Sequence, residues 1–250
     1  MDEKAFDGVD TLVHLAGAGI AEKRWTPQRK KEILDTRVKS TALLVDFVRS
    51  KTHSLKTVIA ASAIGYYGIG IEDKLLSETD QAGTNFLATV VVEWEKESAK
   101  FQSAGLRLVQ VRTGIVLSNR GGALKEMTWP VRLGIGAPLG SGRQIMSWIH
   151  IDDLCALFVW AIENKSVSGI FNAAAPNPVS NREFSVALGR QLGRPVWIPF
   201  IPGLALRLLL GEMADLVLNG SRISCEKALK NGFRFRYSQL DDALRDLFPK

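Results

Sequence analysis

The chain has 250 residues, 46% of them hydrophobic and 23% charged, which is the composition of an ordinary globular protein that needs no disulfides. Its net charge of +6 favours anionic small molecules but gives only weak support to a nucleic-acid partner, and no stretch contains the roughly 20 uninterrupted apolar residues of a membrane-spanning helix. The acidic N-terminus is not a signal peptide, and Cys155 and Cys225 lie in no metal-binding pattern. We therefore expect a cytoplasmic protein with free thiols, no bound metal, and neither nucleic acid nor membrane as a partner.

Strand and helix patterns alternate in the first half of the chain. Short apolar runs predict strands at residues 10–16, 55–62 and 106–117, and helical patterns lie between them at residues 27–51 and 86–105. Pro27 suits the first turn of one helix, and Gly105 suits the end of the other. Because strands that alternate with helices form crossover units, we expect the three strands to pair in one parallel sheet.

The second half is less regular. We predict a glycine-rich loop at residues 133–144, a strand within residues 168–176, and an amphipathic helix packed on the core at residues 200–220. Three helix starts carry capping residues, namely Asp152, the pair Ser180 and Glu183, and the pair Ser238 and Asp241. The helix that begins at Ser180 should end at Gly193.

Five stretches, in this order, resemble a known family: HLAGAGI (14–20), AASAIGYYG (60–68), VRTGIVLS (111–118), SWIHIDDL (147–154) and FNAAAPNPVSNREF (171–184). They are similar to the extended short-chain dehydrogenase/reductases, and more closely to the sugar-nucleotide-epimerase-like group that is sometimes labelled as cell-division inhibitors. Residues 206–247 resemble the C-terminal domain of unknown function of that group. The resemblance covers nearly the whole chain and implies NADP or NAD as the cofactor.

The same resemblance implies an α/β protein with a doubly wound parallel sheet, Rossmann-like but lacking its first strands, and a small C-terminal α+β lobe. We expect a truncated NAD(P)-binding domain at residues 1–175, with a lobe insertion at about 118–149, and a substrate lobe at residues 176–250. The family's fold opens with a strand, a GxxGxxG turn and a helix whose N-terminus holds the pyrophosphate, and this chain contains no GxxGxxG. We therefore expect weak NAD(P) binding by this chain, and self-association through an open sheet edge.

The usual catalytic pair of the family is missing. Enzymes of this family use a tyrosine whose pKa is lowered by a lysine four residues later, and this chain contains no YxxxK. Leu87 and Val91 occupy the equivalent positions. Ser62 is the nearest hydroxyl to the family's catalytic serine, although its spacing to the following tyrosines places Ala63 in that slot. The catalytic candidates are therefore Ser62, Tyr66 and Tyr67, and the alternative for both tyrosines is packing with a hydrogen-bonded hydroxyl.

The strand ends supply the other candidates. The resemblance implies cofactor contacts for Ala16, Gly17 and Ala18, and Arg37, Ser62 and Arg112 are further candidates for cofactor binding. Arg37 stands where the family has an asparagine, and Arg112, at a strand end, could also hold a phosphate or a carboxylate of the substrate. Arg143 and Asn172 are the candidates for substrate binding, since an arginine suits a phosphate or a carboxylate. Ordinary surface ion pairing is the alternative for Arg112 and Arg143.

Two acidic patterns favour structural roles. Glu93 and Glu95 face different sides of a helix, which favours salt bridges over a paired-carboxylate site. His150, followed by Asp152 and Asp153, fits a strand end and a helix cap better than a catalytic pair. The leading hypothesis is an NAD(P)-binding epimerase or reductase that acts on a small polar, nucleotide-linked substrate. The alternative is a non-catalytic nucleotide-sensing or protein-interaction module that retains the fold.

Overall fold

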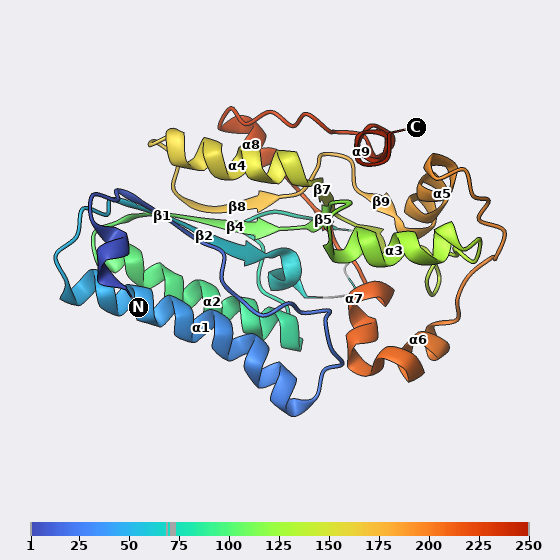
Figure 1. Cartoon of the computed structure of the whole chain (residues 1–250), viewed down its shortest axis with the longest axis horizontal. Helices are drawn as coiled ribbons and strands as arrows, with labels where there is room; N and C mark the ends of the chain where they lie inside the picture. Colours follow the sequence, from blue (N-terminus) through green and yellow to red (C-terminus); the bar gives the residue numbers. More distant parts are fainter. Residues whose placement is uncertain (1, 69, 71–73, 250) are drawn as a thin grey trace.

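A central parallel sheet organises the molecule (Figure 1). The computed structural model describes residues 2–68, 70 and 74–249. The largest sheet has the strand order β1-β2-β4-β8, and each neighbouring pair is parallel. Its strands are β1 (Thr11–His14), β2 (Thr57–Ala63), β4 (Arg107–Thr113) and β8 (Gly169–Ala173). The predicted parallel sheet is confirmed.

Helices cover both faces of this sheet. α1 (Pro27–Ser50) and α2 (Phe86–Ser103) lie on one face, and α4 (Ile151–Glu163) and α8 (Glu226–Lys230) lie on the other (Figure 1). Alternate residues of a strand point to opposite faces. Val58, Ala60 and Leu108 therefore pack in the core beside α1 and α2, and Ile59, Val109 and Val111 pack in the core beside α4 and α8. The strands carry apolar residues on both faces because both faces are covered, as in a doubly wound fold.

The ends of α1 and α2 follow from their sequences. Thr26 caps α1, because its Oγ1 accepts a hydrogen bond from the backbone N–H of Arg29 at 3.1 Å, and Pro27 occupies the first turn as predicted. Asn85 caps α2 in the same way through the N–H of Ala88 at 2.9 Å. Just beyond α2, Gly105 adopts a φ of 84°, the left-handed conformation that glycine adopts without strain.

The third predicted strand, at residues 106–117, is two strands instead of one. β4 ends at Thr113, and β5 (Ile115–Leu117) leaves the main sheet to pair with β7 (Trp148–His150). Gly114 makes the change of direction possible, because a Cβ at this position would lie 2.5 Å from the carbonyl oxygen of Ser147. The apolar run hides this break, since both pieces are buried.

A second hydrophobic core lies where residues of the 117–148 segment meet helices nearer the C-terminus. α3 (Gly122–Arg132), which the sequence analysis does not predict, α5 (Asn181–Gln191) and α9 (Leu240–Leu247) pack around Leu117 and Trp148. Short elements complete the frame: η1 (Glu3–Phe6), η2 (Ile64–Tyr67), the parallel pair β3 (Leu75–Leu76) and β10 (Arg222–Ile223), and the antiparallel pair β6 (Ile145–Met146) and β9 (Val179–Ser180).

The amphipathic helix predicted at residues 200–220 is wrong as a single element. The structure has α6 (Gly203–Leu210), η3 (Gly211–Ala214) and α7 (Asp215–Leu218), and Gly211 breaks the helix with a φ of 62°. Most leucines of α6 do not pack on the core either, as Leu204 and Leu208 are 72% and 74% exposed. Within the described part of the chain, no helix is long and apolar enough to cross a membrane.

Of the three predicted helix caps, one is present and two are absent. The capping box of Ser180 and Glu183 is present. Asp152 is not the cap of α4; His150 is, through its Nδ1, which accepts the N–H of Asp152 at 3.1 Å. The box predicted at Ser238 and Asp241 is absent, because α9 starts from Gln239 without a side-chain cap. The carboxylate of Asp241 instead pairs with the guanidinium of Arg190 at 2.6 Å.

Candidate functional site

Three neighbouring strands of the main sheet place polar residues side by side near their carboxyl ends. Ser62 on β2 lies opposite Arg112 on β4, and Arg112 lies opposite Asn172 on β8. Ligands of doubly wound proteins bind outside this edge of the sheet. The register therefore brings three of the sequence candidates into one row.

Arg112, the middle residue of this row, forms a buried ion pair with Glu95 of α2. Nε and Nη2 of Arg112 each donate a hydrogen bond of 2.8 Å to the Glu95 carboxylate, and Ser62 Oγ donates one of 2.5 Å to the same group. Arg112 is only 1% exposed. Burial alone would lower the pKa of Arg112, but the hydrogen bonds and charge of Glu95 raise it above its ordinary value. This bidentate geometry is what allows both charges to stay buried.

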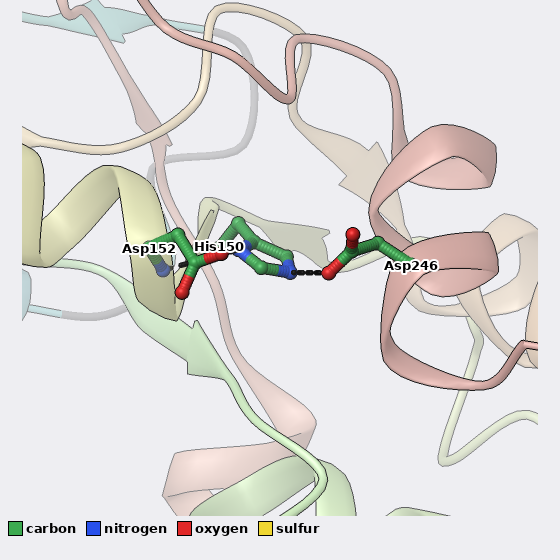
Figure 2. A group of neighbouring side chains, drawn as sticks. All are labelled: His150, Asp152 and Asp246. Atoms are coloured by element: carbon green, nitrogen blue, oxygen red, sulfur yellow. Dashed lines mark hydrogen bonds and ion pairs between the residues drawn. The ribbon is translucent and has the colours of Figure 1, made fainter.

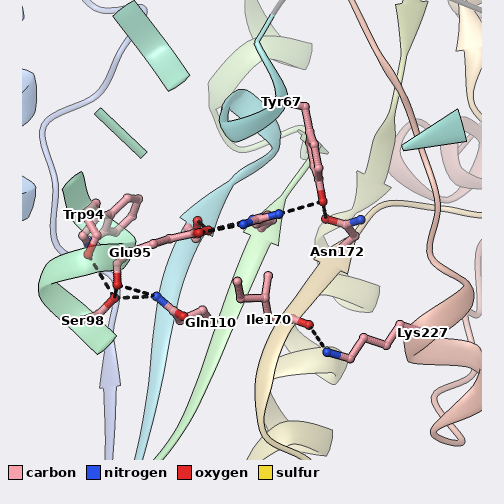
Figure 3. Close-up of polar contacts among 10 residues, drawn as sticks. Tyr67, Trp94, Glu95, Ser98, Gln110, Ile170, Asn172 and Lys227 are labelled. Carbon is pink, nitrogen blue, oxygen red and sulfur yellow. Dashed lines mark hydrogen bonds and ion pairs between the residues drawn. The ribbon is translucent and has the colours of Figure 1, made fainter. Parts of the chain in front are cut away.

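Tyr67 extends the network to the C-terminal part of the chain. Its hydroxyl accepts a hydrogen bond from Arg112 Nη1 at 3.0 Å and donates one to Asn172 Oδ1 at 2.7 Å (Figure 3). Asn172 Nδ2 in turn donates to the carbonyl of Ser224 at 3.1 Å. Tyr67 is fully buried, and burial raises its pKa to about 12. At neutral pH the phenol therefore keeps its proton, with its hydroxyl fully engaged.

Tyr66 covers the same arginine from the outside. The guanidinium carbon of Arg112 lies 3.3 Å from the centre of the Tyr66 ring, and the two tyrosine rings meet edge to face at 5.3 Å. Tyr66 is half-buried, whereas Tyr67 is enclosed. Tyr66 is therefore the tyrosine of η2 that keeps part of its surface accessible.

The turn that carries both tyrosines depends on close backbone packing. Gly68 follows η2 with a φ of 79°, and a Cβ on Gly83 would lie 2.5 Å from the Gly68 Cα. On the other side of η2, a Cβ on Gly65 would lie 3.4 Å from Leu87 and 3.8 Å from Val91. Apolar side chains thus pack beside η2 on this side.

The loop after β1 is held by α1. Arg37 Nη1 donates to the carbonyl of Ala18 at 3.0 Å, and the Ala18 N–H donates to Thr36 Oγ1 at 3.0 Å. A Cβ on Gly17 would touch the Arg37 side chain at 3.0 Å, so the loop lies flat on the arginine. Burial, followed by the charge of Arg29, lowers the pKa of Arg37. The structure thus brings Gly17, Ala18 and Arg37 together, while Ala16 and Gly17 remain exposed.

Arg143 lies apart from this cluster. It belongs to the glycine-rich loop before β6, its side chain is exposed, and its N–H bonds to Ser141 Oγ at 3.2 Å. None of the described contacts joins it to the tyrosines. Asn172, the other substrate candidate, is fully buried with its amide engaged by Tyr67 and Ser224.

His150 belongs to a second polar group at the joint of β7, α4 and α9 (Figure 2). Its Nε2 lies 3.3 Å from Asp246 Oδ2, an ion-pair distance without hydrogen-bond alignment, and its ring stacks on Tyr237 at 3.9 Å. Because Nδ1 accepts the Asp152 N–H, the neutral ring carries its proton on Nε2. A metal ligated by Nε2 would have to displace that proton, so the arrangement favours a cap with an ionic contact over a metal site.

The buried partner of Arg112, Glu95, is a functional residue that the sequence patterns do not predict. Glu95 occurs on the buried stripe of α2, which includes Ala88, Val91 and Ser98 at helical spacing. A carboxylate on such a stripe signals a buried partner, but the sequence does not say which residue it is. Glu93, which faces away, lies 3.9 Å from Lys96 in an exposed pair.

Comparisons with known proteins agree with the fold. Residues 3–174 match the NAD dependent epimerase/dehydratase family, and residues 201–247 match a domain of unknown function, DUF1731. The Staphylococcus aureus (strain MRSA252) epimerase family protein SAR0825 is 39% identical over an alignment of 254 positions, which covers 100% of this chain and 82% of the relative. The Mycobacterium bovis epimerase family protein Mb2239 is 40% identical over 244 residues, covering 97% of this chain and 80% of the relative.

Solved structures show the same architecture. The human epimerase family protein SDR39U1 (isoform 2), crystallised with NADPH, superposes with a TM-score of 0.88 at 30% identity, covering 96% of this chain and 81% of that one. The Bacillus cereus UDP-glucuronic acid 4-epimerase in complex with NAD superposes with a TM-score of 0.77 at 16% identity, over 98% of this chain and 76% of that one. The second likeness concerns the fold alone.

Proposed function

Because the chain belongs to the NAD-dependent epimerase/dehydratase family, we propose that it binds NADP(H) or NAD(H) at the carboxyl edge of its sheet and acts on a small polar, nucleotide-linked substrate. The observation that carries the proposal is the cluster of Tyr66, Arg112 and Tyr67 at that edge. The NADPH bound to the human relative favours the phosphorylated cofactor.

The residues present fit one end of such a cofactor. The exposed backbone of Ala16 and Gly17, together with half-buried Ala63 and Gly65, offers small residues that a ribose and a flat nicotinamide ring can approach closely. The sequence contains no GxxGxxG turn to receive the pyrophosphate. The cofactor would supply or accept a hydride, and affinity would rest on the ribose and nicotinamide side.

Tyr66 is our candidate for the proton-transfer group. Its ring is fixed on the Arg112 guanidinium, which Glu95 and Ser62 hold in place, and part of its surface faces outward. Tyr67 instead positions Arg112 and is itself buried. Replacing the proton donor of such a reaction lowers turnover by roughly a hundredfold or more.

Two further assignments rest on the same proposal. Arg143, whose guanidinium is exposed, would bind a phosphate or carboxylate of the substrate. Residues 176–250 would form the substrate lobe, and the ion pair of Lys30 and Glu212 links this lobe to the start of α1, near the β1 loop. The loss of the usual pair to Leu87 and Val91 supports the second candidate function, a nucleotide sensor without catalysis.

A titration followed by a turnover assay tests the proposal. NADPH should bind weakly to this 250-residue chain, and more tightly by several powers of ten to the longer Staphylococcus aureus relative, because each charge-assisted hydrogen bond to the pyrophosphate contributes roughly 1.5–3 kcal/mol. With NADPH and a panel of sugar nucleotides and small carbonyl compounds, Tyr66→Phe should abolish conversion while Tyr67→Phe lowers it less.

Each outcome of this assay is informative. Nucleotide-induced stabilisation without conversion of any compound would favour the sensor. A failure of the relative to bind NADPH or NADH would overturn the cofactor assignment itself. Equal loss of conversion in both tyrosine variants would remove Tyr66 from its role as the proton-transfer group.

A further inference from the structure

Large apolar side chains are exposed on two segments, one formed by α3 and the loop after it and the other running into α6. Figure 1 shows that α3 and α6 lie toward the same end of the molecule. At least half of the surface of each is exposed: Trp129, Leu133, Ile135, Trp197, Phe200, Leu204, Leu208 and Leu209. We call these residues the apolar end face. Exposed leucines and tryptophans in this number mark an interaction site, because single scattered apolar residues are the rule elsewhere on protein surfaces.

The two segments of the apolar end face pack side by side. Trp197 Nε1 donates a hydrogen bond of 2.9 Å to the carbonyl of Gly134, which places the indole on the loop that follows α3. Ile201 exchanges two backbone hydrogen bonds with that loop, donating to Pro138 at 2.8 Å and accepting from Gly140 at 2.9 Å. The surface is therefore held in shape by the backbone and does not depend on a loose loop.

Exposed charge on and beside the same segments is mostly positive, although Glu126 lies on α3 and Glu212 directly follows α6. Residues 127–151 and 184–211 contain no aspartate or glutamate, but they contain five exposed arginines, at positions 132, 143, 190, 194 and 207. Arg190 and Arg207 pair with Asp241 and Asp215. Among the described residues, Arg132 and Arg194 have no acidic partner. The apolar end face thus combines apolar side chains with unneutralised positive charge.

We propose that the apolar end face docks on an anionic lipid surface. Leucines and aromatic rings insert at the boundary between headgroups and acyl chains, and arginines beside them attract anionic headgroups. A second copy of the chain fits less well, since a symmetric contact would oppose the unpaired Arg132 and Arg194 of one copy to the same arginines of the other. The sequence-based expectation of no membrane partner considered only spanning helices, and a peripheral contact needs none.

Co-sedimentation with vesicles tests this proposal. The chain should bind vesicles of phosphatidylcholine mixed with phosphatidylglycerol. It should bind vesicles of phosphatidylcholine alone much more weakly. The double variant Leu204→Ser with Leu208→Ser should lower the bound fraction about tenfold or more, because both side chains are nearly three-quarters exposed and would insert. The matched control is Leu43→Ser with Leu75→Ser, which removes two leucines of similar type, 52% and 55% exposed, that lie outside the apolar end face.

A charge variant separates the electrostatic contribution to vesicle binding from the apolar contribution. Arg132→Glu with Arg194→Glu should abolish the preference for anionic vesicles, and salt should weaken the binding of the unmodified chain. Thermal melting confirms that each variant is folded. Absence of vesicle binding by the unmodified chain, or equal loss in the control, would overturn the proposal. So would concentration-dependent dimerisation that disappears only in the Leu204 and Leu208 variant, which would assign the face to a second copy.

Discussion

Two buried histidines, His14 and His150, make the stability of the fold depend on pH. His14, whose Nε2 lies 3.0 Å from Thr41 Oγ1, and His150 both have a pKa below the ordinary value of 6.5 because burial disfavours the charged ring. A histidine with a lowered pKa stabilises the fold fully above its unfolded value, and this contribution is lost as the pH falls through the folded value. The free energy of unfolding should therefore decrease below pH 6.5.

The variant His150→Asn isolates one of these groups. Asparagine keeps a side-chain oxygen that can cap α4 but does not titrate, and it loses the contacts with Asp246 and Tyr237. We expect a loss of about 1 kcal/mol at pH 7.5 and a shallower decline of stability down to about pH 5 than in the unmodified chain. Urea denaturation at a series of pH values measures both. An unchanged slope would show that His150 is not a source of the acid sensitivity.

Single residues of the candidate site were partly predictable. The ends of parallel strands meet at one edge, so the row of Ser62, Arg112 and Asn172 follows from the strand pattern and its register. Burial was not predictable, because whether Arg112 meets solvent or Glu95 depends on the rotation of α2 against the sheet. For Arg143, the glycine-rich loop that carries it was predicted from the sequence. That this loop lies apart from Arg112 and the two tyrosines was not predictable.

At the scale of elements, capping residues allow a matched comparison. Ser180→Ala should cost about 1 kcal/mol, because its Oγ accepts the N–H of Glu183 and its N–H is bonded by the Glu183 carboxylate. Ser238→Ala should cost only a few tenths, because the same sequence pattern forms no cap at α9. Equal losses in chemical denaturation of the two variants would contradict this account of α5.

Elements with strong local signals agree best with the sequence. β1, β2, β4, α1 and α2 were predicted from apolar runs and helix caps, which are local properties. The break at Gly114 depends on close approach of distant backbone, namely the Ser147 carbonyl, and the break at Gly211 depends on a left-handed φ. α3 was missed because it starts at a glycine pair and contains Pro130, residues typical of loops.

At the scale of the whole molecule, the open edge of the sheet should govern association. Within the described residues β1 pairs with β2 on one side only, and Val13 is 39% exposed. Such an edge offers unpaired backbone groups to another chain. Light scattering should show self-association that rises with concentration, and Val13→Lys should reduce it, whereas Val159→Lys on α4, 49% exposed, should not.

This test is independent of the apolar end face. Association through the edge responds to Val13 and not to Leu204 or Leu208, which lie on α6. A strictly monomeric mass at all concentrations would show that the edge is protected without a partner, for example by its shortness of four residues.

Residues 222–233 pack against strands formed by much earlier residues, and this affects the order in which the chain folds during synthesis. Ala228 and Phe233 share a core with Ile59, Val109 and Phe171, and β10 pairs with β3 across nearly 150 positions. These contacts cannot form until residues 222–233 have left the ribosome, so the sheet assembled from earlier residues has one apolar face incompletely covered until then. During that interval the nascent chain exposes this face to chaperones or to aggregation, and the packing of residues 222–233 covers it.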